Sequence, residues 1–307
     1  MSATPRHIIT TPVQPAVKQP LWWTVTWRSS RRSCEISAIT TNGEPSHSHP
    51  TTATSEDIPR SLGGETSMRS PTQKTIVGRV GGLWRYPIKS LDGEPLDALS
   101  FDRRGVERDR EWALVDAEGA LASGKPTTRF RKVPGLLRHA GRLNGDVPLI
   151  VLEDGRQAPV DSAEAARLVE EIAGPGWALQ REEAVPHFDA GAVHLVTSAT
   201  LATLSAAARW AVSVERLRPN VLIELSGEGF PEDGWVEGTL ELGSARLRVT
   251  NRVVRCVMVN HRRPGLRARR DVLKLVGSLN QACAGVYADV LVPGEVRVGD
   301  PVSLGSA

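Results

Sequence analysis

Short runs of alternating apolar and polar residues dominate the chain from residue 76 onward. Alternation with a period of two is typical of half-buried β-strands, and turn pairs such as Asp92-Gly93 and Asp154-Gly155 separate the runs. In the first half the pattern predicts strands at residues 77–84, 96–101, 111–115 and 149–152. In the second half it predicts strands at residues 193–196, 220–225, 239–242, 245–258, 287–292 and 296–298.

Helical periodicity is confined to three segments. Residues 161–172 carry apolar side chains at helical spacing behind a capping Asp161, and residues 198–209 and 270–283 are also predicted to be helical. Because short strands outnumber helices, we expect a mainly β (α+β) protein with β-barrel domains, rather than a doubly wound parallel sheet. A polar stretch at residues 181–190 predicts a boundary near residue 182.

The first 67 residues differ in texture from the rest, since serine and threonine supply 21 of them and no periodic apolar face is present. Such a segment cannot bury enough apolar surface to offset its chain entropy, so residues 1–75 are predicted to be a disordered extension. Its apolar run at residues 21–27 precedes Arg28, whereas a signal peptide places basic residues before a longer apolar core. Two interpretations stay open: a targeting or membrane-surface peptide, or an over-extended start with Met68 as the true first residue.

Composition narrows the class of protein. Hydrophobic residues at 40% and charged residues at 24% are typical of a soluble globular chain, and no run of 18 apolar residues predicts a membrane span. A net charge of +3 gives no reason to expect a nucleic-acid partner. No membrane partner is expected, because no membrane span is predicted. The three cysteines, Cys34, Cys256 and Cys283, cannot form a disulfide framework and favour a reducing, cytoplasmic location.

Three sequence patterns approach known binding motifs and depart from them in detail. Residues 119–126 resemble a phosphate-binding loop, but Pro126 stands where a hydroxyl would bind magnesium. Gly78 to Gly82 lacks the dinucleotide-binding spacing, and the seven histidines show no paired spacing for zinc. The arginine-rich stretch, defined as residues 262–270, contains five arginines. Three interpretations of this stretch stay open: a solvated loop that leads into a helix, an anion-binding site, or a docking surface for an acidic partner.

The two later cysteines fall within predicted elements. Cys283 continues an apolar helical stripe with Val276, which predicts a packed core thiol. Cys256 ends the predicted strand 245–258, where alternation keeps Val257 on the core face and Cys256 on the opposite face. An accessible thiol beside Arg255 would have its thiolate favoured, so Cys256 is the candidate functional thiol, with an inert surface cysteine as the alternative.

Several segments resemble one family, in the same order along the chain. Trp84-Arg85-Tyr86-Pro87-Ile88-Lys89-Ser90 and Asp109-Arg110-Glu111-Trp112 are similar to motifs of the β-barrel domain that precedes MOSC domains (molybdenum cofactor sulfurase C-terminal domains). The MOSC domain itself is resembled by Thr197-Ser198-Ala199, Arg218-Pro219-Asn220, Trp235, Arg255-Cys256 and Gly299-Asp300-Pro301-Val302. The resemblance covers residues 76–305. It implies a MOSC N-terminal β-barrel domain at residues 76–182 and a MOSC β-barrel domain at residues 183–307.

This resemblance implies a molybdenum–pterin cofactor with a cysteine thiolate on the metal, for which Cys256 is the matching position. It implies these cofactor contacts: Lys89, Ser90, Arg110, Thr197, Ser198, Arg218, Asn220 and Arg255. Thr197 or Ser198 would also cap the following helix, and Trp235 is expected to be a packing anchor. Pyridoxal phosphate is not expected, because nothing in the chain resembles the desulfurase part of molybdenum cofactor sulfurases.

The family includes the mitochondrial amidoxime-reducing component and its bacterial relatives, so the resemblance implies molybdenum-dependent reduction of small N-hydroxylated compounds such as hydroxylamines and amidoximes. Three cysteines cannot supply a four-cysteine iron–sulfur cluster, and electrons are therefore expected from a separate ferredoxin or flavoprotein reductase. The arginine-rich stretch is the candidate dock for that donor. A non-catalytic carrier of the cofactor or of sulfur remains the alternative.

Overall fold

The computed structural model describes residues 75–305. Predictions about residues 1–74, including the disordered extension and Cys34, lie outside the described residues. Within the described range the protein is mainly β, as predicted, with three α-helices: α1 (Ala163–Ala173), α2 (Ser198–Ala208) and α3 (Val272–Asn280). None of the helices between residues 75 and 305 has the length and apolar character needed to cross a bilayer.

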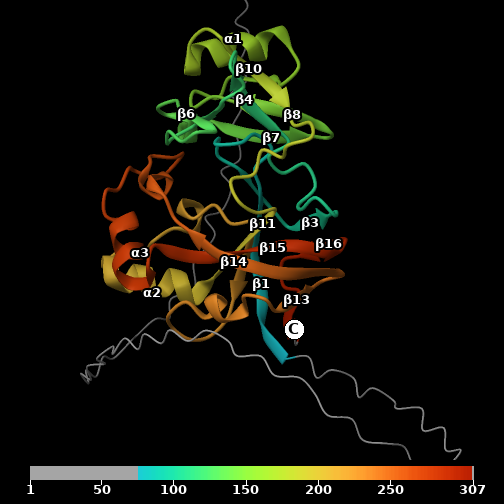
Figure 1. Ribbon diagram of the computed structural model, residues 1–307, viewed down its shortest axis with the longest axis vertical. Coiled ribbons are helices and arrows are strands. Elements are labelled where there is room, and N and C mark those ends of the chain that lie inside the picture. Colours follow the sequence, from blue (N-terminus) through green and yellow to red (C-terminus); the bar gives the residue numbers. More distant parts are fainter. Residues whose placement is uncertain (1–74, 306–307) are drawn as a thin grey trace, which may run out of the picture. The chain divides into compact units, whose positions relative to one another are not determined.

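Seven strands close into a barrel, because β12 pairs with both β11 and β1. In ring order they are β1 (Thr75–Arg85), β12 (Val221–Glu224), β11 (Val193–Thr197), β15 (Cys283–Val292), β14 (Ala245–Val254), β13 (Thr239–Leu242) and β17 (Pro301–Gly305). β2 (Glu94–Leu96) pairs with β1 outside the ring. The barrel is thus completed by β1, the first strand of the described residues (Figure 1).

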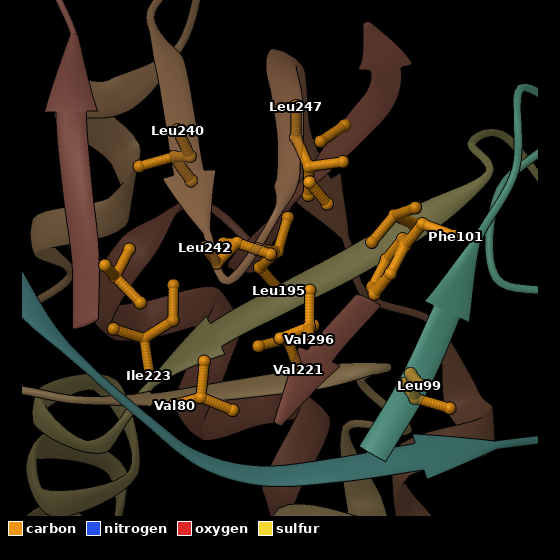
Figure 2. Packing of buried hydrophobic residues seen from close by; sticks show 14 of the residues in the cluster. Val80, Leu99, Phe101, Leu195, Val221, Ile223, Leu240, Leu242, Leu247 and Val296 are labelled. Carbon is orange, nitrogen blue, oxygen red and sulfur yellow. The ribbon is translucent and has the colours of Figure 1, made fainter. Parts of the chain in front are cut away.

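The barrel is filled by alternate residues of its strands (Figure 2). Leu195, Ile223 and Leu247 are fully buried at its centre, as the period-two pattern predicts. Burial of this apolar surface is the main stabilising contribution to the barrel. Trp235 lies in the same cluster with 6% of its surface exposed, which confirms its role as a packing anchor.

Two smaller sheets and α1 follow β3 (Ala98–Phe101) in the first half of the chain (Figure 1). One sheet contains β10 (Trp177–Arg181), β4 (Trp112–Asp116), β5 (Leu121–Ser123) and β6 (Phe130–Lys132). The other contains β7 (Ala140–Asn144), β8 (Val147–Val151) and β9 (Gln157–Pro159). α1 contributes Leu168 and Val169 to their shared core, and Ser162 rather than Asp161 caps it. β3 pairs with β16 (Gly294–Arg297), which ties this half to the second.

The predicted helix 270–283 is too long. α3 ends at Asn280 because Gln281 and Ala282 adopt left-handed backbone conformations, with φ of 53° and 63°. Cys283 is consequently the first residue of β15 rather than part of a helical stripe. It is 6% exposed, so the expectation of a packed core thiol is confirmed although its element is different.

The predicted strand 245–258 is also too long. Its pairing with β15 shifts register between Arg252 and Val254, β14 ends there, and a 3₁₀ turn forms at Val257–Asn260. Alternation therefore does not continue, and Val257 is 40% exposed instead of facing the core. Cys256 lies between the strand and the turn, where its side chain is partly exposed.

Candidate functional site

A cavity of about 260 Å³ is lined by residues from both halves of the chain. From the first half it takes the predicted site residues Lys89, Ser90 and Arg110. From the second half it takes Arg218, Asn220, Arg255 and Cys256. Seven of the nine predicted site residues are therefore brought together around one space.

Backbone geometry sets the direction of three of these side chains. Ser90, Arg110 and Arg218 all adopt left-handed conformations, with φ of 64°, 56° and 53°. For residues with a Cβ this conformation costs about 1 kcal/mol or more each. Hydrogen bonds offset the cost: the Arg110 amide donates to the Tyr86 carbonyl at 2.8 Å, and the Arg218 amide donates to the Glu215 carbonyl at 3.2 Å. Three of the eight described non-glycine residues with positive φ thus lie on the cavity wall.

The cavity has a strong excess of positive charge. Its described wall carries the cations Lys89, Arg110, Lys125, Arg218, Arg252 and Arg255, against the single carboxylate of Asp189. Like charges held together at low dielectric repel one another, and a bound anion relieves that repulsion. The wall is therefore suited to an anionic ligand.

The guanidinium of Arg218 is a buried cation that lacks an ion-pair partner among residues 75–305. Its Nη1 is buried without a hydrogen-bond partner, and within the described residues its guanidinium makes no hydrogen bond or ion pair. Its guanidinium carbon instead lies 4.3 Å from the centre of the Tyr86 ring. Burial lowers the pKa of Arg218 to about 10, so the group is charged at neutral pH at a cost. A ligand carrying negative charge would remove that cost.

Lys89 and Asp189 form an ion pair in the cavity, and Lys125 Nζ lies 3.9 Å from the second oxygen of the same carboxylate. Lys89 is 4% exposed, donates to Asp189 and lies 4.4 Å from the centre of the Phe130 ring. Burial lowers the pKa of Lys89 to about 8 in spite of the nearby carboxylate. Burial acts in the opposite direction on Asp189, but the charge and hydrogen bond of Lys89 hold its pKa at about 2. Both members of the pair are charged near neutral pH, and Lys89 loses its proton as the pH rises through its pKa of about 8.

A buried histidine connects Arg255 to Arg218. Nη1 of Arg255 lies 3.5 Å from Nε2 of His194, and Nδ1 of His194 lies 3.1 Å from the Arg218 carbonyl oxygen. Burial and the charge of Arg255 lower the pKa of His194 well below its ordinary value, so the ring is neutral. It then donates from Nδ1 and accepts at Nε2. The second Arg255 nitrogen, Nη2, donates to the Leu217 carbonyl at 2.6 Å, which fixes the residue preceding Cys256.

Asn220 braces the cavity wall from a fully buried position. Its Oδ1 accepts from the His194 amide at 3.1 Å, and its Nδ2 donates to the Trp84 carbonyl at 3.2 Å. The side chain therefore joins β1 and β11 beside the cavity. One Nδ2 hydrogen is left for a ligand.

Thr197 and Ser198 do not line the cavity with the other predicted residues. Thr197 Oγ1 accepts from the Thr200 amide at 3.2 Å, which confirms it as the cap of α2, and donates to Glu232 at 2.6 Å. The Ser198 hydroxyl exchanges hydrogen bonds with the backbone of Leu225. Both hydroxyls are thus committed within the barrel.

Several residues of the cavity carry no prediction from the sequence. Asp189 falls in the stretch assigned to a domain boundary, and Lys125 falls in the rejected phosphate-loop pattern. His194 and Tyr287 lie on buried strands, where a single polar residue gives no functional signal. Among these residues, only Lys125 could have been identified from the sequence, because it follows Ser123-Gly124 in a turn that resembles a phosphate-binding loop.

The arginine-rich stretch divides into buried and exposed residues. The expected solvated loop leading into a helix is confirmed except at Arg263, which is 2% exposed and forms an ion pair with Asp92 at 3.2 Å. Arg267, Arg269 and Arg270 are exposed, and within the described residues none of them forms an ion pair with a carboxylate. These three exposed arginines form a cationic segment that begins eleven residues after Cys256. The 3₁₀ turn at Val257–Asn260 lies between Cys256 and this segment.

Metal coordination by the protein alone is not supported. No group of three or more histidine, cysteine or carboxylate side chains between residues 75 and 305 is arranged to hold a metal ion. Cys256 is the one cysteine among the described cavity residues. A metal bound here would need most of its ligands from a cofactor or from solvent.

The chain shows clear similarity to known proteins. Residues 183–303 match the family model of the MOSC domain, and residues 77–188 match that of the MOSC N-terminal beta barrel domain. Mitochondrial amidoxime reducing component 2 of Rattus norvegicus is 26% identical over 293 residues, spanning 76% of this chain and 85% of that protein. Mitochondrial amidoxime-reducing component 1 of Homo sapiens is 24% identical over 287 residues, spanning 74% and 83% respectively. The solved structure of the YUAD protein from Bacillus subtilis aligns with a TM-score of 0.43 at 14% identity, over 77% of this chain and all of that chain.

Anion affinity of the cavity is expected to fall as the pH rises through about 8, because Lys89 then loses its proton. Sulfate is a suitable probe, since it remains a dianion throughout this range. Calorimetric titration should give roughly tenfold weaker binding at about pH 9.5 than at about pH 7, with proton uptake on binding near pH 8. Lys89→Gln should bind weakly at both pH values. Equal pH dependence in this variant and the wild type would contradict the role of Lys89.

Proposed function

Because this chain belongs to the MOSC family, with a MOSC N-terminal beta barrel domain ahead of its MOSC domain, we propose that it binds a molybdenum–pterin cofactor in the cationic cavity. MOSC domains are associated with binding of the molybdenum cofactor. The observation that carries the proposal is the buried Arg218 guanidinium, which has no partner within the described residues and lines the same cavity as the thiol of Cys256. The cofactor combines the two groups that these residues need, a phosphate and a thiophilic metal.

The donor set of the cavity fits this cofactor. A dianionic phosphate would accept charge-assisted hydrogen bonds from Lys89, Arg110 and Arg218. The unpartnered Nη1 of Arg218 and Nε of Arg255 are buried donors that such a ligand would satisfy. Ser90, which is 6% exposed, adds a hydroxyl beside Lys89.

We assign the remaining contacts by residue type. Cys256 would supply a thiolate to the metal, since soft sulfur ligands suit a metal that is also bound by pterin sulfurs. Asn220 has one free N–H for the ring edge of the pterin. Arg255 would be held by His194 and the Leu217 carbonyl through its terminal nitrogens, which leaves its Nε–H for the ligand. Thr197 and Ser198 are left out of the assignment, because neither lines the cavity.

The proposed reaction is the two-electron, two-proton reduction of N-hydroxylated compounds with release of water, which converts hydroxylamines to amines and amidoximes to amidines. When bound, the molybdenum cofactor supplies two-electron oxygen-atom chemistry, which side chains alone cannot perform. Support comes from the relatives named amidoxime-reducing components, which match most of the chain at about 25% identity. The protein's own contribution would be to bind the cofactor, to hold the charges around it and to leave Cys256 partly accessible.

We further propose that a separate protein, a ferredoxin or flavoprotein reductase, supplies the electrons. The exposed arginines Arg267, Arg269 and Arg270 would attract an acidic donor, and the apolar side chains of Val254 and Val257, 73% and 40% exposed, flank Cys256. This combination of charge and apolar contact is typical of short-lived electron-transfer complexes. A cytoplasmic location belongs to the same proposal, since neither described cysteine forms a disulfide.

The proposal predicts that purified wild-type protein contains molybdenum and that Cys256→Ser loses most of it, because a hydroxyl is a much weaker ligand for a soft metal site. Elemental analysis measures the metal. Cys283→Ala is the matched control, since it removes a buried thiol outside the cavity and should keep wild-type molybdenum content. Absence of molybdenum from the wild type, or equal content in Cys256→Ser, would reject the assignment.

Turnover separates an enzyme from a carrier. With a chemical reductant and a hydroxylamine, the molybdenum-containing wild type should form the amine, whereas a carrier of cofactor or sulfur would retain molybdenum without turnover.

Charge reversal at the proposed dock, in Arg267→Glu with Arg270→Glu, should raise the KM for a reduced [2Fe–2S] ferredoxin roughly tenfold at low ionic strength. Steady-state kinetics at varied donor concentration measure the effect, and added salt should shrink it. Molybdenum content and turnover with the chemical reductant should stay at wild-type values. Arg167→Glu is the control, because Arg167 is an exposed arginine of α1. An unchanged KM in the double variant would exclude this surface.

A further inference from the structure

One aromatic ring lies against two of the cavity arginines. The guanidinium carbon of Arg110 is 4.8 Å from the centre of the Tyr86 ring, and that of Arg218 is 4.3 Å from it. At these distances the electron-rich face of the ring attracts a cation. Arg110 comes from the first half of the chain and Arg218 from the second, so the ring joins guanidinium groups of both halves.

Tyr86 is itself held from several directions. Its hydroxyl donates to the Pro219 carbonyl at 3.0 Å, and its amide donates to Asp109 Oδ1 at 2.7 Å. A Cβ at Gly93 would overlap the ring, so the glycine lets the chain pass close beside it. The side chain is 1% exposed and is not part of the cavity lining. Tyr86 is therefore a fixed support that a cavity ligand does not touch.

The two arginines depend on this support to different degrees. Arg110 also forms an ion pair with Asp109, whose carboxylate is fully buried. The guanidinium of Arg218 makes no hydrogen bond or ion pair within the described residues, so its contact with the Tyr86 ring is what orients it. Both residues have left-handed backbone conformations, and both side chains line the cavity. Without the ring, Arg218 would occupy several rotamers, and ordering it would weaken ligand binding.

We propose that Tyr86 is a positioning residue, which holds Arg110 and Arg218 as a guanidinium pair for a single doubly charged phosphate group. The inference rests on the proposed function only for the identity of the ligand, whose phosphate would be that of the pterin. The pair itself would bind any phosphate monoester or inorganic phosphate that reaches the cavity. Tyr86 acts through the arginines and makes no contact of its own with the ligand.

The test compares phosphate binding by cofactor-free protein, measured by calorimetry with inorganic phosphate. Tyr86→Phe keeps the ring and should bind within about twofold of wild type, whereas Tyr86→Leu should bind roughly tenfold more weakly. Trp210→Leu is the matched control. The Trp210 ring also lies against two guanidinium groups, those of Arg269 at 4.1 Å and Arg216 at 5.5 Å, but outside the cavity. Its loss should leave phosphate affinity unchanged.

A second variant protects the test against a failure of Tyr86→Leu to fold. In this variant, pentafluorophenylalanine replaces Tyr86. The fluorinated ring keeps the shape and nearly the size of the aromatic group, but the electrostatic potential at its face is no longer negative. The variant should lose phosphate affinity as Tyr86→Leu does, with a thermal midpoint close to that of Tyr86→Phe. Wild-type affinity in the fluorinated protein, or equal weakening in Tyr86→Phe and Tyr86→Leu, would overturn the inference.

The outcomes separate this inference from the proposed function. Phosphate binding that depends on the ring, in a protein that never contains molybdenum, would support the positioning role and reject the cofactor assignment. Molybdenum in the wild type, together with phosphate binding that does not depend on the ring, would support the cofactor assignment and reject the positioning role.

Discussion

A concentration of positive charge that nearby carboxylates compensate only in part is the constraint on which the site depends. The described cavity wall brings six cationic side chains together with one carboxylate, and burial lowers the pKa values of Lys89 and Arg218. A protein without a ligand gains nothing from such an arrangement, because each buried charge costs free energy unless it is paired. The backbone holds Arg110 and Arg218 in left-handed conformations in spite of this cost. An anionic ligand gives the arrangement a physical reason.

The cavity is a consequence of how the barrel closes. β1 pairs with β12 and then leads directly into the segment that carries Tyr86, Lys89 and Ser90. Two hydrogen bonds between Trp84 and Asn220 hold the end of β1 beside the start of β12, the strand that follows Arg218. The two groups of cations therefore meet because β1, the first described strand, belongs to the same barrel as β12, the strand that follows Arg218.

Much of the barrel and most of the site could be predicted from the sequence, for different reasons. The long strand β14 buries alternate residues along most of its length and shows its period clearly, whereas three-residue strands such as β5, β6 and β9 are too short for any periodicity. Motif resemblance identified Lys89, Arg218 and Cys256, but it could not exclude Thr197. That residue lies three positions beyond His194 on β11, about 10 Å farther along the strand. Asp189 and His194 join the site only through tertiary contacts, which leave no mark on the sequence around them.

The central claim, that unpaired Arg218 binds the phosphate of a pterin cofactor, is tested most directly by the pterin content of the purified protein. Fluorescence of the released and oxidised pterin, measured for wild type and for Arg218→Gln, gives the stoichiometry. The account predicts pterin in the wild type and a loss of most of it in Arg218→Gln. Thermal stability of that variant should be unchanged or higher, because the substitution removes a buried charge with no partner. Wild-type protein without pterin, or equal pterin in both proteins, would contradict it.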